Sequence, residues 1–206
     1  MFLDALGTLV ELEPPWAHLA GALDMDPGDE RLIAAVRVEM GYYRDHAHEG
    51  VDAASLGRLR DRCAVLLSRE LGRRVEVETM MDAIRFRAFD DATPALAALR
   101  GRGLRLVCVS NWDVSLDEVL ERCGLAGALD GVVSSAGAGA RKPDPAIFSA
   151  ALELAGCAAE ETLHVGDTEA EDVAGARAAG IRSLLLDREG TGELASLIEI
   201  EEHLHP

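Results

Sequence analysis

The second half of the sequence alternates between short apolar runs and stretches with helical periodicity, and this alternation limits the possible folds more than any other feature. The apolar runs lie at 104–110, 131–135, 162–166 and 181–186. The stretches with helical periodicity lie at 93–103, 115–124, 144–156 and 170–180. Strands that are apolar throughout and separated by helices are typical of a parallel sheet with helices on both faces. The sequence therefore predicts an α/β fold with a doubly wound parallel sheet.

A different pattern precedes this alternation. Two long stretches, which begin after Asp29 and Asp52, repeat apolar residues at helical spacing without any strand alternation. An aspartate directly before a helical stretch is a common N-cap, because its carboxylate accepts hydrogen bonds from the first free amides. We therefore expect an all-helical insert at 14–89 and a sheet core formed by 1–13 and 90–206.

The charge balance excludes several classes of partner. The formal net charge is −17 at pH 7, whereas nucleic acid recognition requires a basic face. The same negative charge disfavours binding to anionic membranes. We expect neither nucleic acid nor a membrane as a partner, and a small anionic substrate would need a local positive group in the site.

The cysteines and the apolar runs indicate the compartment. The four cysteines form no CxxC pair and no zinc-like spacing with histidine, which favours free thiols. No apolar run approaches the roughly 18 residues of a membrane span, and the first residues have no signal-peptide pattern. These features predict a soluble cytoplasmic protein.

Polar residues at the ends of the predicted strands are the candidates for function, because parallel sheets bind ligands at the carboxyl ends of their strands. Each of them has an ordinary explanation when it is taken alone, as a turn former, a helix cap or a solvated charge. Together they offer carboxylates, a hydroxyl, an amide and an ammonium. They are Asp4, Ser110, Asn111, Lys142, Asp167 and Asp172.

Lys142 is the only lysine among 20 basic residues, so 20 − 1 = 19 are arginine. A solvated charge would be served equally well by arginine, which favours a specific role for Lys142. An ammonium is a compact charge, whereas a guanidinium is a larger planar fork. Oxygen ligands with few charges suit Mg²⁺, which binds one or two carboxylates together with a substrate phosphate. The pattern predicts a pocket for Mg²⁺ and a phosphoryl group, too tight for arginine.

These residues, in this order, resemble the motifs of the haloacid dehalogenase-like (HAD) superfamily. The segment DALGT at 4–8 resembles its first motif and VCVSN at 107–111 its second. KPDP at 142–145 resembles the third, and VGDTEAEDVAGA at 165–176 the fourth. The resemblance implies a Rossmann-like HAD core, with the helical insert as a cap over the active site.

The resemblance also implies roles for single residues. Asp4 would be the nucleophile that forms an aspartyl-phosphate, and Lys142 would neutralise charge between Asp4 and the phosphoryl group. Ser110 would bind a phosphoryl oxygen with help from Asn111. The ligands implied for Mg²⁺ are Asp4 and Asp167 through their side chains, Leu6 through its carbonyl oxygen and Asp172 in support.

Leu6 departs from the pattern of the phosphatases in this superfamily, which carry a second aspartate at that position as general acid and base. A leucine cannot transfer a proton, and such transfer typically contributes about 10²–10⁴-fold. The metal site is unaffected, because a carbonyl oxygen requires no particular side chain. The departure weakens a simple phosphatase role.

Three other interpretations follow from this departure. A phosphonatase-type enzyme would need a lysine in the cap, which the range 14–89 lacks. A 2-haloacid dehalogenase needs no second acid, but Phe148 replaces the tyrosine expected after the lysine, and GDTEAED is the metal-binding form of the fourth motif. A HAD-fold protein without turnover, serving as a binding or regulatory module, is consistent with Leu6 but not with the intact Asp4, Lys142 and Asp167.

The expected function is that of a HAD-like, Mg²⁺-dependent phosphohydrolase acting on a small phosphorylated metabolite. The protein is expected to be a monomer or a homodimer. Tyr42, Tyr43, Arg44, His46 and His48 either line the substrate pocket or form an ordinary helix end.

Overall fold

The computed structural model describes residues 1–204 and contains a parallel sheet of five strands in the order β5-β4-β1-β6-β7. The first strand of the sequence, β1, lies at the centre of the sheet between β4 and β6. The strands are β1 (Phe2–Leu3), β4 (Val107–Ser110), β5 (Gly131–Ser134), β6 (Leu163–Gly166) and β7 (Arg182–Leu185). The predicted parallel α/β sheet is confirmed.

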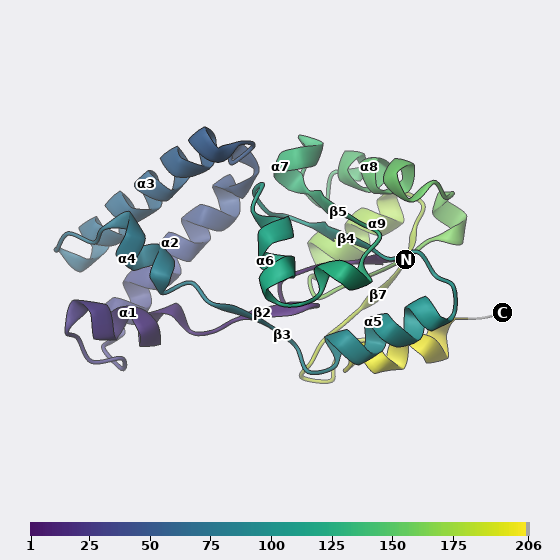
Figure 1. Cartoon of the computed structure of the whole chain (residues 1–206), viewed down its shortest axis with the longest axis horizontal. Coiled ribbons are helices and arrows are strands. Elements are labelled where there is room, and N and C mark those ends of the chain that lie inside the picture. The colour runs from purple at the N-terminus through teal and green to yellow at the C-terminus, as the bar shows by residue number, and fades with distance from the viewer. Residues whose placement is uncertain (205–206) are drawn as a thin grey trace.

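Helices cover both faces of the sheet, as Figure 1 shows for α5 and α8 on opposite sides. They are α5 (Ala92–Gly101), α6 (Leu116–Arg122), α7 (Ser135–Ala138), α8 (Pro145–Ala155) and α9 (Ala174–Ala178). Short 3₁₀ helices lie at Ala126–Ala128, Ala159–Glu161 and Leu197–His203.

Neighbouring residues of each strand enter different hydrophobic cores, because side chains alternate between the two faces of a sheet. Leu3 packs with residues of α5, α6 and the 3₁₀ helix Leu197–His203. Phe2 packs on the other face with α8 and Ala176 of α9. Both residues are completely buried. A strand buried on both faces must be apolar throughout, which explains the continuous apolar runs in the sequence.

The helical stretch predicted at 170–180 differs from the expectation at its beginning. Residues Glu169–Val173 form a π-helical turn, and the α-helix begins only at Ala174. The amides of Asp172 and Val173 both donate to the carbonyl oxygen of Thr168. The wider turn follows β6 directly and carries Asp172 to the edge of the sheet.

Four helices, which we call the helical segment, lie together beside the sheet (Figure 1). They are α1 (Pro15–Leu23), α2 (Glu30–His46), α3 (Ala53–Leu71) and α4 (Val77–Asp82), with a 3₁₀ turn at Ala47–Glu49. Their buried residues form a hydrophobic cluster of their own. The carboxylates of Asp29 and Asp52 accept hydrogen bonds at the starts of α2 and α3, as predicted.

Two short strands join the helical segment to the sheet. β2 (Val10–Leu12) and β3 (Phe86–Ala88) pair in an antiparallel ribbon. The range 14–89 therefore contains one strand, β3, besides its helices. The ribbon places both connections side by side, and the boundaries of the two domains stay a prediction.

The cysteines are unpaired, and the helices are too short or too polar to cross a membrane, among residues 1–204. All four cysteines are free, with Cys63 and Cys108 buried and Cys123 and Cys157 partly buried. Within residues 1–204, none of the helices has the length and apolar character that crossing a membrane requires.

Arg188, in the loop after β7, ties three parts of the chain together. Its guanidinium donates to both carboxylate oxygens of Asp91, at 3.0 and 3.1 Å, and to the carbonyl oxygens of Gly7 and Thr8. It also lies 3.6 Å from the ring centroid of Phe89. Arg188 thus braces the turn after β1 against the chain that follows the ribbon.

We expect Asp91→Ala to destabilise the protein by about 1 kcal/mol or more, because the partly buried partners of the lost acceptor remain unsatisfied. Besides Arg188, the carboxylate accepts hydrogen bonds from the Ser196 hydroxyl at 2.8 Å and the Leu197 amide at 2.9 Å. Urea unfolding of both proteins measures the difference in free energy of unfolding.

Glu76→Ala is the matched control, because it breaks an ion pair with Arg74 in which both side chains are mostly exposed. Its effect should stay within about 0.5 kcal/mol. Equal effects of the two substitutions would contradict a bracing role for Asp91.

Candidate active site

The topology of the sheet brings the predicted site residues to one edge. Asp4 directly follows β1, Ser110 ends β4 and Asp167 directly follows β6. Because these three strands are parallel neighbours, their carboxyl ends meet with Asp4 in the middle. Lys142 reaches the same point from the loop between α7 and α8, and Asp172 from the π-helical turn.

Asp4 lies at the centre of this edge and is buried. The Ser110 hydroxyl donates to its Oδ1 at 2.8 Å, and Lys142 Nζ donates to the same oxygen at 2.5 Å. The main-chain amide of Asp4 donates to the carbonyl oxygen of Val165 at 2.9 Å, which fixes the backbone. Neither side-chain bond uses Oδ2 of Asp4.

Lys142 is only 1% exposed and lies between two carboxylates. Besides Asp4, its Nζ contacts Oδ1 of Asp172 at 2.5 Å. Burial alone would lower the pKa of Lys142, but the two carboxylates outweigh burial and raise it. Lys142 therefore keeps its charge, as a buried cation does when it is paired. The single lysine is a part of this edge and not a solvated charge.

The pKa values of Asp4 and Asp172 shift in opposite directions. Burial raises the pKa of Asp4 to about 7; Lys142 opposes the rise, whereas Asp172 and Asp167 add to it. Burial would also raise the pKa of Asp172, but Lys142 and His164 outweigh it and lower that pKa. Lys142 and His164 thus favour the ionised form of Asp172, whereas burial favours the protonated form of Asp4.

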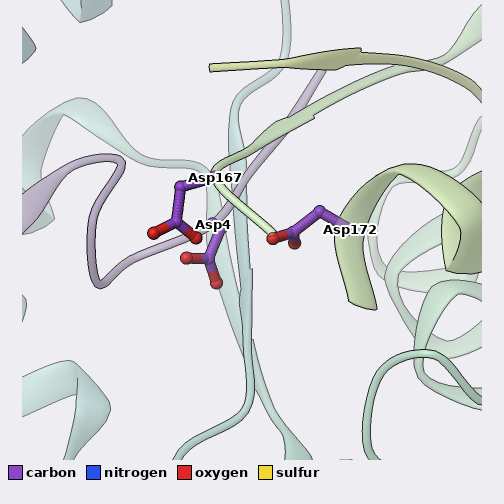
Figure 2. Close-up of side chains that lie close together, drawn as sticks. All are labelled: Asp4, Asp167 and Asp172. Atoms are coloured by element: carbon purple, nitrogen blue, oxygen red, sulfur yellow. The ribbon is translucent and has the colours of Figure 1, made fainter. Parts of the chain in front are cut away.

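The carboxylates of Asp4, Asp167 and Asp172 converge, as Figure 2 shows. One oxygen of each lies within 4.8 Å of the others. Desolvation raises the pKa of Asp167, and the carboxylate of Asp172 adds to this rise. Hard oxygen donors grouped in this way are the ligands that Mg²⁺ takes.

The absence of a side chain at Gly7 leaves space for the carboxylate of Asp167. A Cβ on Gly7 would lie 1.9 Å from Oδ2 of Asp167, and the φ angle of Gly7 is +84°. Only glycine adopts this backbone conformation without strain. The glycine of the first motif is therefore needed both for the turn after Asp4 and for the approach of the second carboxylate.

Asp172 already has donors on both of its oxygens. Its Oδ1 accepts from Lys142 and from His164 Nε2, the latter at 2.8 Å, and its Oδ2 accepts from the Thr168 amide at 3.1 Å. These bonds suit the supporting role that was expected for Asp172. In Asp4 and Asp167 the side-chain donors within residues 1–204 contact Oδ1, which leaves Oδ2 for a cation.

Asn111 is engaged with the main chain of Lys142. Its Oδ1 accepts from the Lys142 amide at 2.7 Å, and its Nδ2 donates to the Lys142 carbonyl oxygen at 3.0 Å. Nδ2 also donates to Glu171 at 2.9 Å, and Glu171 accepts from Arg141 at 3.3 Å. Asn111 thus holds the lysine loop, and its predicted help in substrate binding stays a prediction.

Leu6 has a partly buried side chain that packs against the core between the sheet and α5. Its position two residues after Asp4 therefore provides no titratable group. The use of its carbonyl oxygen as a metal ligand stays a prediction.

The aromatic and basic residues at the end of α2 and in the following 3₁₀ turn differ in their surroundings. The Tyr43 hydroxyl donates to Oδ2 of Asp113 at 2.7 Å, which links the helical segment to the loop after β4. Tyr42 and His46 stack with their ring centroids 4.0 Å apart. Arg44 and His48 are exposed. Tyr43 is thus at the contact between the two parts of the chain.

Two contributions were missed by reasoning from the sequence. His164 is a polar residue inside an apolar strand, and that anomaly in LHVG was the available signal. Glu171 lies between the two aspartates of the fourth motif, and its contact with Asn111 depends on the tertiary fold.

The chain was compared with known proteins. Haloacid dehalogenase-like hydrolase domain-containing protein 3 of Danio rerio is 40% identical over 116 residues, which are 56% of this chain and 48% of that protein. Phosphoserine phosphatase of Thermus thermophilus is 41% identical over 105 residues, which are 50% of this chain and 42% of that protein. This chain therefore spans about half the length of the curated relatives it matches.

A solved structure has the same fold over nearly the whole chain. The HAD phosphatase of Thermococcus onnurineus superposes with a TM-score of 0.68 at 22% identity, covering 98% of this chain and 95% of the other. Identity this low shows a shared fold and no more. The model of the haloacid dehalogenase-like hydrolase family matches residues 1–180. The chain therefore belongs to the haloacid dehalogenase-like hydrolases.

Proposed function

We propose that this protein is a Mg²⁺-dependent phosphohydrolase that acts on a small phosphorylated metabolite. The observation that carries the proposal is the position of Lys142 Nζ, which contacts the buried Asp4 and Asp172 at once. A cation held at one oxygen of a candidate nucleophile can also neutralise the charge of a phosphoryl group that this nucleophile attacks. The relatives named as phosphatases support the same chemistry.

In the proposed reaction the carboxylate of Asp4 attacks phosphorus. The bond between phosphorus and the ester oxygen breaks, and the leaving alcohol takes up a proton. Water then hydrolyses the aspartyl-phosphate, which releases inorganic phosphate and restores the carboxylate. Ser110 and Lys142 bind phosphoryl oxygens during both steps.

Mg²⁺ would be held by Asp4 and Asp167 and by the carbonyl oxygen of Leu6, with Asp172 in support. When bound, it would neutralise phosphoryl charge and favour the ionised form of Asp4. The residues fit such an ion, since three carboxylate oxygens already lie within 4.8 Å of one another. We further propose that the range 14–89, which contains the helical segment, is a cap over this site and that the protein acts in the cytoplasm as a monomer or homodimer.

A 2-haloacid dehalogenase and a binding or regulatory protein are the two alternative functions. Solved 2-haloacid dehalogenases share this fold, but Phe148, at the position of their tyrosine, is completely buried in the core under α8. A binding or regulatory protein without turnover is favoured by Leu6. The connected contacts of Asp4, Ser110 and Lys142 favour an enzyme, because a binding module needs no nucleophile aligned with a cation.

The proposal predicts release of inorganic phosphate from at least one ester in a panel of small phosphate monoesters. Release should require Mg²⁺, stop on chelation and fall below detection in Asp4→Asn, because that amide is not nucleophilic. Binding of phosphate mimics without release from any ester would favour a binding protein. Release of chloride from 2-haloacids without metal would indicate a dehalogenase.

Leu6→Asp tests whether a proton carrier is missing. The variant should hydrolyse generic phosphate esters on the order of tenfold faster or more, because a carboxylate two residues after Asp4 can protonate the leaving group. Leu6→Asn serves as the control, since it adds polarity without a titratable group. An equal rate in Leu6→Asp and wild type, with the fold intact, would mean that another group already transfers the proton.

Lys142→Arg tests the need for a compact ammonium. The larger guanidinium should displace the Asp4 carboxylate, and misplacement at a reacting centre can cost roughly 10²-fold. We expect much weaker binding of tungstate, measured by calorimetry, in a variant that still folds. Arg141→Lys is the matched control, because Arg141 is adjacent and partly exposed. Wild-type affinity in Lys142→Arg would show that an ammonium is not required.

A further inference from the structure

A series of buried polar contacts leads from Asp4, at the carboxyl edge of the sheet, to His164 in the protein interior. Asp4 Oδ1 lies 2.5 Å from Lys142 Nζ, which lies 2.5 Å from Asp172 Oδ1, which in turn lies 2.8 Å from His164 Nε2. His164 is completely buried. Its hydrogen bond to a site carboxylate, among residues 1–204, is the one to Asp172.

His164 has one hydrogen-bond partner for its two ring nitrogens. Among residues 1–204, Nδ1 has none, and the ring packs edge-on against Phe148 with centroids 5.2 Å apart. The partner of Nε2 is a carboxylate oxygen of Asp172 at 2.8 Å, which can only accept, so Nε2 carries a proton and donates it to Asp172.

A histidine at this position buries a ring nitrogen, Nδ1, that has no partner among residues 1–204. The hydrogen bond that the ring does make goes to Asp172. In the sheet His164 lies beside Phe2 of β1 and Ser183 of β7, and its ring packs against Phe148 of α8. A leucine at this position would leave no buried acceptor unsatisfied, whereas Nδ1 of His164 has no partner among residues 1–204. The single feature that histidine adds here is a donor directed at Asp172.

The orientation of Asp172 depends on its three donors. Its carboxyl group sits directly on the backbone of Gly166, where a Cβ would lie 2.1 Å from Cγ of Asp172. The Thr168 amide holds Oδ2, whereas His164 and Lys142 share Oδ1. Without the imidazole donor, Oδ1 would keep Lys142 as its one side-chain donor among residues 1–204.

We propose that His164 is a positioning residue: it fixes the carboxylate of Asp172, which in turn fixes the ammonium of Lys142 against Asp4. The effect on turnover rests on the proposed phosphohydrolase function, whereas the effect on Lys142 does not. Loss of the donor frees Asp172 to rotate toward Asp4 and Asp167, and Lys142 then loses its fixed partner.

Two amide variants test this at nearly equal buried polarity. The amide nitrogen of glutamine reaches the place of Nε2, whereas that of asparagine reaches only the place of Nδ1. His164→Gln can therefore still donate to Asp172, and His164→Asn cannot. We expect kcat on p-nitrophenyl phosphate to be at least tenfold lower in His164→Asn than in His164→Gln, with a smaller difference in KM.

The single lysine gives a second readout that needs no turnover. Protein grown with lysine labelled by a nitrogen isotope at Nζ yields one side-chain ammonium signal in NMR spectra, because Lys142 is the only lysine. The signal should stay close to the wild-type position in His164→Gln and shift or broaden in His164→Asn. If His164→Asn does not fold, His164→Leu replaces it, since leucine adds no buried polar atom.

The outcomes separate the two proposals. A displaced lysine signal in His164→Asn or His164→Leu, but not in His164→Gln, supports positioning by His164 even if no ester is hydrolysed, which would overturn the phosphohydrolase alone. An unchanged lysine signal in all variants overturns the role of His164. Equal kcat in the asparagine and glutamine variants of an active enzyme overturns it as well.

Discussion

The buried ammonium of Lys142 holds together the carboxyl edge of the sheet, because Asp4 and Asp172 approach the same point inside the protein. Two ionised carboxylates at that distance would repel each other strongly in a poorly solvated site. With Nζ between them, one charge is neutralised directly, and the remaining negative charge is available for a further cation. The positions of the three strand ends and of the π-helical turn are all compatible with this one contact.

The parallel sheet makes this convergence possible at little cost. β1 is only two residues long, but it pairs with β4 on one side and β6 on the other, so that its carboxyl end cannot shift alone. Both faces of β1 are covered by apolar side chains. The candidate nucleophile thus extends from a central strand that is paired on both sides, and Arg188 braces the turn that follows it.

Much of the fold and part of the site could be predicted from the sequence, for different physical reasons. Continuous apolar runs require burial on two faces, so the parallel sheet followed from the alternation of these runs with helical stretches. The strand-end positions of Asp4, Ser110 and Asp167 then required these residues to meet. The hydrogen bonds of Asn111 and His164 could not be predicted in this way, because each depends on which segment packs opposite. The site residues lie together as expected, but their roles remain proposals.

The antiparallel ribbon of β2 and β3 has a consequence for how this chain can vary. The amide of Glu13 donates to the carbonyl oxygen of Arg85 at 2.9 Å, so the path leaves the sheet and returns to it at points one hydrogen bond apart. The entropy of closing a loop grows only slowly with its length. Insertions and deletions between these two points therefore leave the strand order of the sheet intact, and the residues at its carboxyl edge can be kept while the helical segment changes.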